Sequence, residues 1–180
     1  MGMLAQFRGC LLGLAIGDAL GAPVEFDKLT AIRARFGPDG ITDLIPWHSL
    51  PAGAYTDDTQ MTLATIRGML AAHAAGEPLA GEGWTVAVYR AYLDWLKTQD
   101  DPAQRRAPGN TCLGALQSGK MGRLDAALNY SKGCGGVMRT APVGLAFRGA
   151  EAFRQGAEFA VITHGHPSGY LSAGFMAELI

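Results

Sequence analysis

The sequence contains few of the residues that favour β-strands and few charged residues. There are 6 Val and 7 Ile among 180 residues, which argues against a large sheet. Charged residues make up 17% of the chain and hydrophobic residues 48%, a balance that argues against intrinsic disorder. The net charge of -1 lacks the positive excess typical of proteins that bind nucleic acids or anionic membranes, so we expect neither partner.

Cysteine and long apolar runs are scarce as well. The three cysteines are odd in number and too widely spaced for a disulfide framework or a zinc site, which favours a cytoplasmic location. No apolar run approaches the roughly 18 residues that a membrane-spanning helix needs. The apolar N-terminus has Arg8 as its only early charge and Asp18 where a signal peptide would be cleaved. We therefore interpret residues 1–22 as a buried helix.

What the chain does contain is small residues in helical patterns, with 25 Gly and 29 Ala. Apolar residues recur at the spacing of one helix face in Leu4, Phe7, Leu11 and Leu14, and again within 84–95 and 153–164. A further helix is predicted over 57–75, capped by Asp57 and ended by Gly76.

These patterns predict a single compact all-α domain over residues 1–180. Because Ala and Gly let backbones approach closely, we expect its helices to pack tightly and at several angles. Residues 27–53 and 98–110 are expected to be irregular.

Three consecutive oxygen-bearing side chains, Thr56, Asp57 and Asp58, stand where the predicted helix begins. Adjacent carboxylates repel, and a helix N-terminus offsets this by only about 0.3–1 kcal/mol for each acid. A hard cation such as Mg²⁺ or Mn²⁺ would offset it far better. The spacing alone allows two interpretations: metal ligands, or a cap (Asp57) followed by a solvated acid (Asp58).

A second acidic segment lies upstream, in residues 13–26. Asp18 ends an apolar stretch, and Glu25 follows Pro23 in a turn. An acid in apolar surroundings needs a partner. We therefore expect Asp18 either to cap a neighbouring helix, with Glu25 exposed, or to take part with Glu25 in metal binding.

Taken together, these segments make the chain resemble the ADP-ribosylglycohydrolase family. The resemblance runs through nearly the whole chain, with the motifs in the family's order. They are GCLLGLAIGDALGAPVEF (9–26), GAYTDDTQMTLA (53–64), GNTC (109–112), KGCGGVMRTAPVGLA (132–146) and ITHGHP (162–167).

The resemblance implies an all-α fold that cleaves the glycosidic bond between ADP-ribose and an acceptor such as an arginine or serine side chain. The substrate would be an ADP-ribosylated protein or a small ADP-ribosyl compound, and two Mg²⁺ or Mn²⁺ ions would take part. The residues that match the metal-binding and catalytic positions are Thr56, Asp57, Asp58 and Glu25. Glu25 would approach both the metals and the scissile bond, and Asp18 would support this corner of the site.

The Gly-rich segment is expected to bind the ligand's diphosphate. Three glycines permit backbone angles forbidden to other residues, namely Gly133, Gly135 and Gly136. A loop of this kind before a helix can aim N–H groups at a phosphate. Cys134 stands where the family often has a polar residue and would act through its backbone. Met138 and Arg139 match the exit of the loop, where Arg139 either binds phosphate or pairs with a core acid.

Two more segments match parts of the family that lie near the ligand. One of them comprises Gly109, Asn110 and Thr111. In the other, His164 continues an apolar helix face and is expected to be a hydrogen-bonded, partly buried histidine or, as the resemblance implies, to lie near the ribose or phosphates. His166 is assigned to the turn before Pro167.

One part of the family's pattern is not found. The family's second metal motif, Gly-Gly-Asp-Thr-Asp-Thr/Ser, has no counterpart, since Asp125 is the last Asp. The final segment predicts a helix with no stop signal and with an apolar face that needs a partner, formed by Leu171, Phe175 and Leu179. We therefore expect an incomplete domain, matching the N-terminal half to two-thirds of the family domain and weakly active or inactive alone.

Completion would come from a separate C-terminal fragment or from an oligomer. The alternative is a catalytically degenerate relative that binds ADP-ribose or regulates a partner without hydrolysis.

Overall fold

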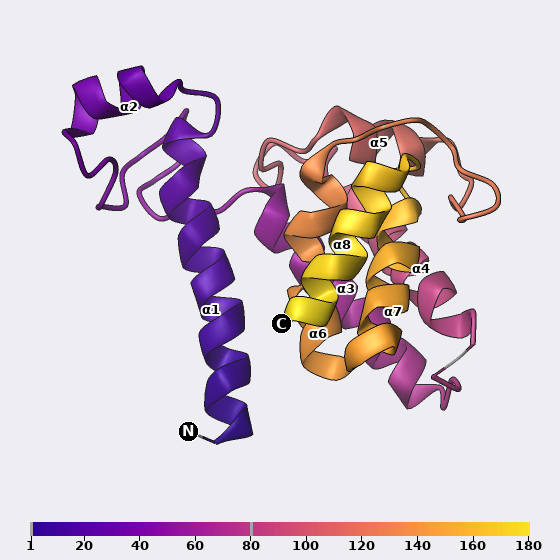
Figure 1. The fold of residues 1–180 in the computed structure, drawn as a ribbon. Helices are drawn as coiled ribbons and strands as arrows, with labels where there is room; N and C mark the ends of the chain where they lie inside the picture. Colours follow the sequence, from indigo (N-terminus) through magenta and orange to yellow (C-terminus); the bar gives the residue numbers. More distant parts are fainter. Residues whose placement is uncertain (1, 80) are drawn as a thin grey trace.

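The computed structural model describes residues 2–79 and 81–180, and these residues contain no named β-strand. The predicted all-α class is confirmed (Figure 1). The α-helices are α1 (Met3–Gly21), α2 (Leu29–Phe36), α3 (Asp57–Ala74), α4 (Gly83–Thr98), α5 (Asn110–Gln117), α6 (Ala141–Ala146), α7 (Gly149–Val161) and α8 (Pro167–Leu179). Two short 3-10 helices are also present, η1 (Ala22–Val24) and η2 (Cys134–Arg139).

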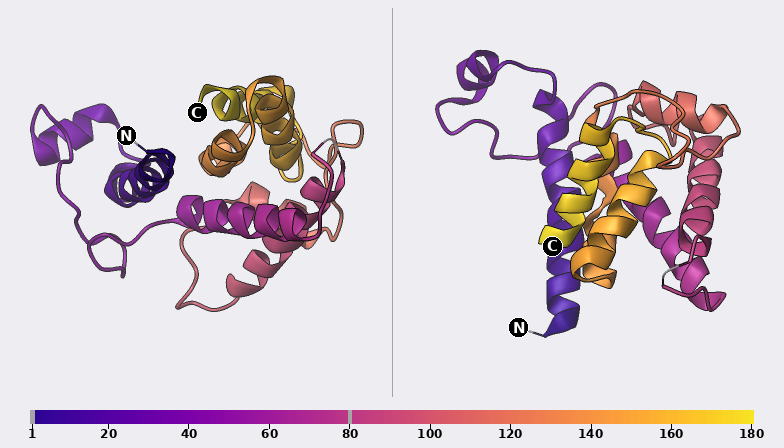
Figure 2. Two further views of the ribbon diagram at one scale, coloured as in Figure 1. Left: turned by 90° about the horizontal axis from the view of Figure 1, so that it is seen from below. Right: turned by 45° about the vertical axis from the view of Figure 1, so that its right-hand side comes forward.

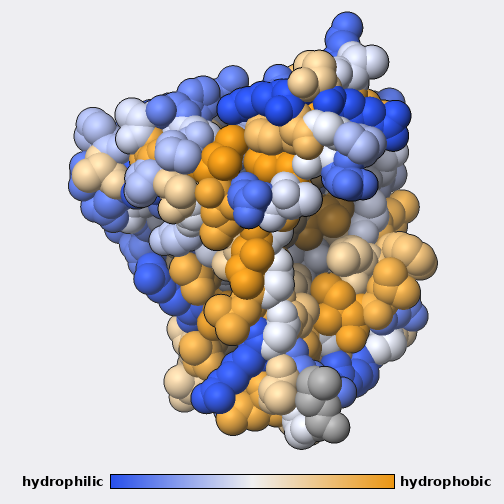
Figure 3. Space-filling view, turned by 90° about the vertical axis from the view of Figure 1, so that its left-hand side faces the viewer, coloured by the Kyte–Doolittle hydropathy of each residue, from blue (hydrophilic) through white to orange (hydrophobic). Residues whose placement is uncertain are grey.

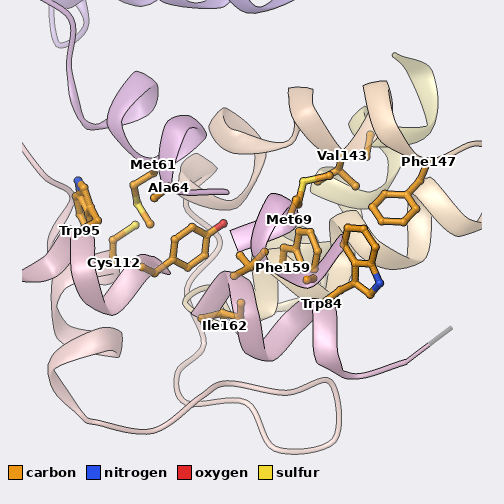
Figure 4. Packing of buried hydrophobic residues seen from close by; sticks show 14 of the residues in the cluster. Met61, Ala64, Met69, Trp84, Trp95, Cys112, Val143, Phe147, Phe159 and Ile162 are labelled. Carbon is orange, nitrogen blue, oxygen red and sulfur yellow. The ribbon is translucent and has the colours of Figure 1, made fainter. Parts of the chain in front are cut away.

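The hydrophobic core lies among α3, α4, α6 and α7 (Figure 4). Met61 of α3, Val88 and Tyr92 of α4 and Phe159 of α7 are all 2% exposed or less. The Tyr92 hydroxyl lies 2.7 Å from Thr65 Oγ1, so the polar end of this buried ring has a partner. The helical periodicity predicted within 84–95 is confirmed, because α4 turns this face into the core.

Glycine lets the helices of this core approach closely, as the composition predicts. A Cβ atom on Gly68 of α3 would lie 2.5 Å from the Cα atom of Val88 on α4. On α7, a Cβ atom at Gly156 would lie 2.8 Å from the Cβ atom of Ala177 on α8. Side chains at these two glycines would push the paired helices apart.

Helix α1 stands beside this bundle and is mostly exposed (Figures 1 and 2). Of its residues only Ala19 is buried, while Leu4, Leu12 and Ile16 are between 58% and 64% exposed. The prediction that this segment is a buried helix is therefore wrong. Helix α1 is apolar on all sides, and this pattern is also typical of a buried helix. In the structure, most of its apolar surface has no neighbour among the described residues (Figure 3).

The prediction that no segment is long and apolar enough to cross a membrane also needs correction. Residues Met3–Val24 meet that criterion by length and composition, and 6% of their most apolar window is buried. A signal sequence and the core helix of a soluble protein meet the same criterion, so it does not assign α1 to a membrane.

The remaining differences concern helix boundaries. Helix α2 forms inside the stretch expected to be irregular, and none of its residues is buried, so it lacks the core face that reveals a helix in sequence. Helix α3 ends as predicted, with Gly76 at a φ of 72°. The final helix is present as α8, and its predicted apolar face is exposed at Leu171, Phe175 and Leu179.

The close approach of α3 and α4 predicts opposite effects for two glycine-to-alanine changes. Gly68→Ala should lower the free energy of unfolding by about 1–3 kcal/mol, because the added methyl group meets the Val88 backbone. In α5, the Cβ atom added by Gly114→Ala would have no other atom within 4 Å. This change should raise the free energy of unfolding by up to about 1 kcal/mol. Chemical denaturation measures both, and equal effects would contradict the packing described.

Candidate functional site

The N-terminus of α3 is held by a carboxylate from α1. Asp18 accepts hydrogen bonds from the Thr56 N–H at 3.0 Å, the Thr59 N–H at 3.1 Å and the Thr59 hydroxyl at 2.6 Å. These bonds satisfy amide groups that have no partner inside the helix. Of the two alternatives for Asp18, the structure shows the cap of a neighbouring helix.

Besides Asp18 from α1, a residue next to α3 also caps this helix, and it is Thr56 rather than Asp57. Its hydroxyl oxygen accepts from the Asp58 N–H at 3.1 Å, and it is 5% exposed. The prediction that Asp57 caps α3 is wrong, because Asp57 is already the first helical residue. Its side chain does not cap α3 and can instead contact another segment.

Asp57 joins α3 to the start of α5. Its N–H donates to the Arg106 carbonyl at 2.8 Å, and its carboxylate Oδ2 accepts from the Gly109 N–H at 3.0 Å. Burial of this side chain, which is 6% exposed, raises its pKa to about 7. The Gly109 bond lowers this pKa, and the charges of Asp58 and Glu25 raise it further. Gly109 is thereby brought next to Asp57, and its predicted place near a ligand stays a prediction.

Asp58 and Glu25 line one cavity of about 550 Å³, together with Asp18, Thr56 and Met138. Glu25 is exposed, and Asp58 is half-buried. Burial raises the pKa of Asp58 to about 6, and the neighbouring charges of Asp18 and Glu25 add to this rise. The structure thus gathers acids from α1, from the turn after it and from α3 around one opening.

The donor set suits a hard dication in its chemistry. It consists of carboxylate and hydroxyl oxygens. Burial and, to a smaller extent, the neighbouring acids raise the pKa values of the two aspartates, and a bound dication would counter both effects. The number of grouped metal-binding side chains is too small, however. Across residues 2–79 and 81–180, no group of three or more His, Cys, Asp or Glu side chains is close enough to hold a metal ion. Asp57 is also not among the residues that line the cavity.

The glycine loop, residues 132–136, lies against His164. Glycine permits positive φ angles, but none of the three glycines in this loop has a φ in that range. They are needed for space instead. A Cβ atom on Gly135 would lie 2.6 Å from Cε1 of His164, and one on Gly136 would lie 2.7 Å from the Cβ atom of Ala160.

Residues at the two ends of η2 differ in accessibility. Cys134, the first residue of η2, is exposed. Met138 is half-buried on the cavity wall, and its carbonyl accepts from the Thr62 hydroxyl at 3.2 Å. Met138 is therefore the member of the predicted loop exit that faces the acidic cavity.

Arg139 lies in the core and fits neither alternative proposed from the sequence. It is 1% exposed, so its guanidinium is not available to a phosphate in this structure. No acidic residue pairs with it among the described residues. Its partners are instead the Phe159 carbonyl at 3.2 Å, the Thr163 hydroxyl at 2.6 Å, the sulfur of Met61 at 3.3 Å and the ring of Tyr92, whose centroid is 4.4 Å away.

His164 is buried at 3% exposure and is hydrogen-bonded, as one of the two interpretations predicts. Its Nδ1 lies 2.9 Å from Thr163 Oγ1. Burial lowers the pKa of His164 to about 4, and the positive charge of Arg139 adds to this effect. His166 caps α8 by accepting from the Ser168 N–H at 2.9 Å, which agrees with its assignment to the turn.

The predicted segment 109–111 forms the start of α5. Asn110 is exposed, and Thr111 Oγ1 lies 3.3 Å from Ser131 Oγ beside the glycine loop. Two contributors were missed from the sequence, Thr59 and Thr163. Each is a small polar residue next to a predicted one, as in the TxxT spacing of residues 56–59, and this proximity is the only signal that could have indicated them.

Comparison with known proteins identifies the family of the chain. A family model described as ADP-ribosylglycohydrolase matches residues 2–180. The chain belongs to the ADP-ribosylglycohydrolase family. The resemblance noted from the five motifs is thereby confirmed, and so is the all-α fold that it implied.

Three relatives of this ADP-ribosylglycohydrolase family member come from different organisms. An uncharacterized protein of Archaeoglobus fulgidus is 32% identical over 147 residues, which are 81% of this chain and 44% of the relative. ADP-ribosyl-[dinitrogen reductase] glycohydrolase of Rhodospirillum rubrum is 33% identical over 88% of this chain and 51% of the relative. ADP-ribosylhydrolase ARH3 of Bos taurus is 28% identical over 94% and 47%. The chain spans about half the length of the curated relatives it matches.

In this ADP-ribosylglycohydrolase family member, the acidic cluster should reduce stability when no metal is present. Asp58→Asn should raise the free energy of unfolding at pH 8, in chelator, by on the order of 1 kcal/mol, because it removes a charge that burial and two neighbouring acids disfavour. Asp94→Asn is the control, since Asp94 is exposed and pairs only with Lys97 at the surface. A loss of stability in Asp58→Asn alone would contradict this.

Acid should destabilise the fold through His164. Below its ordinary pKa of 6.5 the unfolded chain takes up a proton that the folded chain accepts only near pH 4. The stability provided by the neutral ring should therefore fall by about 1.4 kcal/mol for each pH unit between 6.5 and 4. Denaturation of wild type and His164→Asn at several pH values measures this, with exposed His73→Gln as control. A difference between wild type and His164→Asn that does not change with pH would refute it.

Proposed function

We propose that this chain contributes to the hydrolysis of the bond between ADP-ribose and an acceptor. The observation that carries the proposal is the meeting of Asp18, Glu25, Thr56 and Asp58 around one cavity, in a chain whose family model is that of ADP-ribosylglycohydrolases. The substrate would be an ADP-ribosylated protein or a small ADP-ribosyl compound. Relatives named for such activities support this.

Cleavage of this bond requires groups that stabilise a developing positive charge. Cleavage of the bond at the anomeric carbon develops oxocarbenium character on the ribose. Glu25, the exposed carboxylate of the cavity, would face the reacting sugar, while Asp58 lies deeper in the wall. Asp18 acts by holding the start of α3 in place through its hydrogen bonds. The glycine loop and His164 would hold the rest of the ligand.

The proposal includes a requirement for Mg²⁺ or Mn²⁺. The residues that would hold the ion are Thr56, Asp57 and Asp58, with Glu25 nearby, and further ligands would have to come from outside this set. A bound dication would supply positive charge that orients the ribose hydroxyls and polarises a water molecule. With so few grouped ligands, we expect the 180-residue chain alone to bind the ion weakly and to turn over slowly.

One observation favours a second candidate function. Because the described residues contain no grouped set of three metal-binding side chains, a relative that binds ADP-ribose without hydrolysing it would also suit this chain. In that case ligand binding would not require a metal, and no turnover would be seen.

Calorimetry with ADP-ribose, with and without MnCl₂, tests the proposal. We expect Mn²⁺ to strengthen ADP-ribose binding, and Asp57→Asn to weaken the Mn²⁺-dependent part by about tenfold or more, since one charged donor is lost while an oxygen remains to accept from Gly109. Asp94→Asn is the control, because this acid is exposed and distant in sequence. If ADP-ribose binds with the same affinity without Mn²⁺ and in Asp57→Asn, the second candidate function is favoured. If wild type does not bind ADP-ribose, both candidates are refuted.

Hydrolysis of ADP-ribosyl-arginine by the same preparations completes this experiment. Slow, Mn²⁺-dependent release of ADP-ribose by wild type, and none by Asp57→Asn, is the expected result. Turnover that is unchanged in Asp57→Asn would show that the acidic cluster is not the reacting site.

A further inference from the structure

A chain of hydrogen bonds connects the buried cation Arg139 to the histidine at the glycine loop. Arg139 Nη2 lies 2.6 Å from Thr163 Oγ1, which in turn lies 2.9 Å from His164 Nδ1. The three residues are 1%, 0% and 3% exposed, so water does not compete for these bonds. The three side chains therefore form one connected unit.

The direction of each bond follows from the donors available. A guanidinium donates and cannot accept, so the Thr163 oxygen accepts from Arg139. The Thr163 oxygen has a second lone pair, but if it accepted from His164 as well, its single hydroxyl hydrogen would have no acceptor among the hydrogen bonds of the described residues. We therefore infer that the hydroxyl donates to His164 Nδ1. A neutral imidazole that accepts at Nδ1 carries its own proton on Nε2. Pairing of the Thr163 hydroxyl hydrogen thus favours one of the two tautomers.

The Nε2 atom faces the backbone of the glycine loop. A Cβ atom on Gly135 would lie 2.9 Å from Nε2, and one on Gly133 would lie 3.3 Å from it. In the part of the chain that the structure describes, Nε2 makes no side-chain hydrogen bond, although the side chain as a whole is 3% exposed. An N–H group at this position is available to donate to a ligand oxygen. Its position suggests that a ligand lying along the loop supplies the acceptor.

Arg139 has an unusual environment for a structural arginine. Its guanidinium has sulfur, carbonyl, hydroxyl and aromatic neighbours and no carboxylate among the described residues, and its Nε makes no hydrogen bond. The charged or titratable groups near His164 are Arg139 itself and the Cys112 thiol, which lies 4.0 Å from Arg139 Nη1. A neutralising acid in this place would favour a protonated histidine.

We propose that Arg139 is a positioning residue that acts through Thr163 to hold His164 as a neutral imidazole with its Nε2–H presented at the glycine loop. There it donates a hydrogen bond to an oxygen of the ligand. The identity of that ligand as an ADP-ribosyl compound rests on the proposed function. The hydrogen-bond relay and the tautomer do not.

Nitrogen NMR of the imidazole rings tests the relay directly. We expect His164 in ¹⁵N-labelled wild type to be the Nε2–H tautomer at pH 7.5, with its signals assigned from their loss in His164→Asn. Thr163→Val, which keeps the side-chain shape and removes the hydroxyl, should give a mixture of tautomers. Thr163→Ser should restore the wild-type spectrum. An Nδ1–H tautomer in wild type, or an unchanged spectrum in Thr163→Val, would overturn the proposal.

A second variant tests the role of the cation. Arg139→Met, which fills the same space without charge, should release the Thr163 hydroxyl to turn and so give mixed His164 tautomers. Circular dichroism reports whether each variant is folded. If Thr163→Val or Arg139→Met does not fold, an Nε2–H tautomer in wild type still supports the relay, and an Nδ1–H tautomer still overturns it. A pure Nε2–H tautomer in folded Arg139→Met would refute the role of Arg139.

Titration with ADP-ribose tests the ligand contact separately. The His164 Nε2 signal should shift on binding, and affinity should fall about fivefold or more in Thr163→Val while changing less than twofold in Thr163→Ser. Binding without any shift at Nε2 would overturn the ligand contact. No binding by wild type would instead refute the proposed function, and the tautomer measurements would still decide the relay.

Discussion

The candidate site depends on the hydrogen bonds between the Asp18 carboxylate and the first turn of α3. Asp18 reaches across 38 positions of sequence to Thr56, and it also binds both the N–H and the hydroxyl of Thr59. This contact brings the turn that carries Glu25 to the helix that carries Asp57 and Asp58. On the other side of the same helix start, Asp57 binds the Gly109 N–H. Two carboxylates thus position three segments around one helix end.

Charge is left uncompensated in two places, at Asp57 and Asp58 and at the buried guanidinium of Arg139. The pKa values of Asp57 and Asp58 are raised because these acids are buried near other acids. Arg139 is a buried cation whose partners are all uncharged. A protein selected only for stability would avoid such arrangements, since buried charges without partners are destabilising. Perturbed groups of this kind are common at functional sites, and Asp58 lines the cavity on which the proposed function rests.

The sequence predicted those features that depend on local pattern. The helical class, the end of α3 at Gly76 and the close helix packing followed from periodicity and small residues. The features it did not predict depend on distant partners. Helix α1 looked buried because it is apolar, but exposure depends on which neighbours are present. Arg139 looked like a ligand or an ion-pair partner, because nothing local shows that the sulfur of Met61 and the ring of Tyr92 surround it.

Helix α1 makes few buried contacts with the rest of the protein, and this affects the order in which the protein would unfold. Its core contribution is a single buried residue, Ala19, and its polar anchor is a single carboxylate. Little free energy therefore opposes its departure, whereas the helices of the bundle share a continuous interior. Amide hydrogen exchange along α1 would be governed by local opening rather than by global unfolding. The acidic cavity would then be dismantled, with Glu25 carried away from Asp58, while the aromatic interior was still intact.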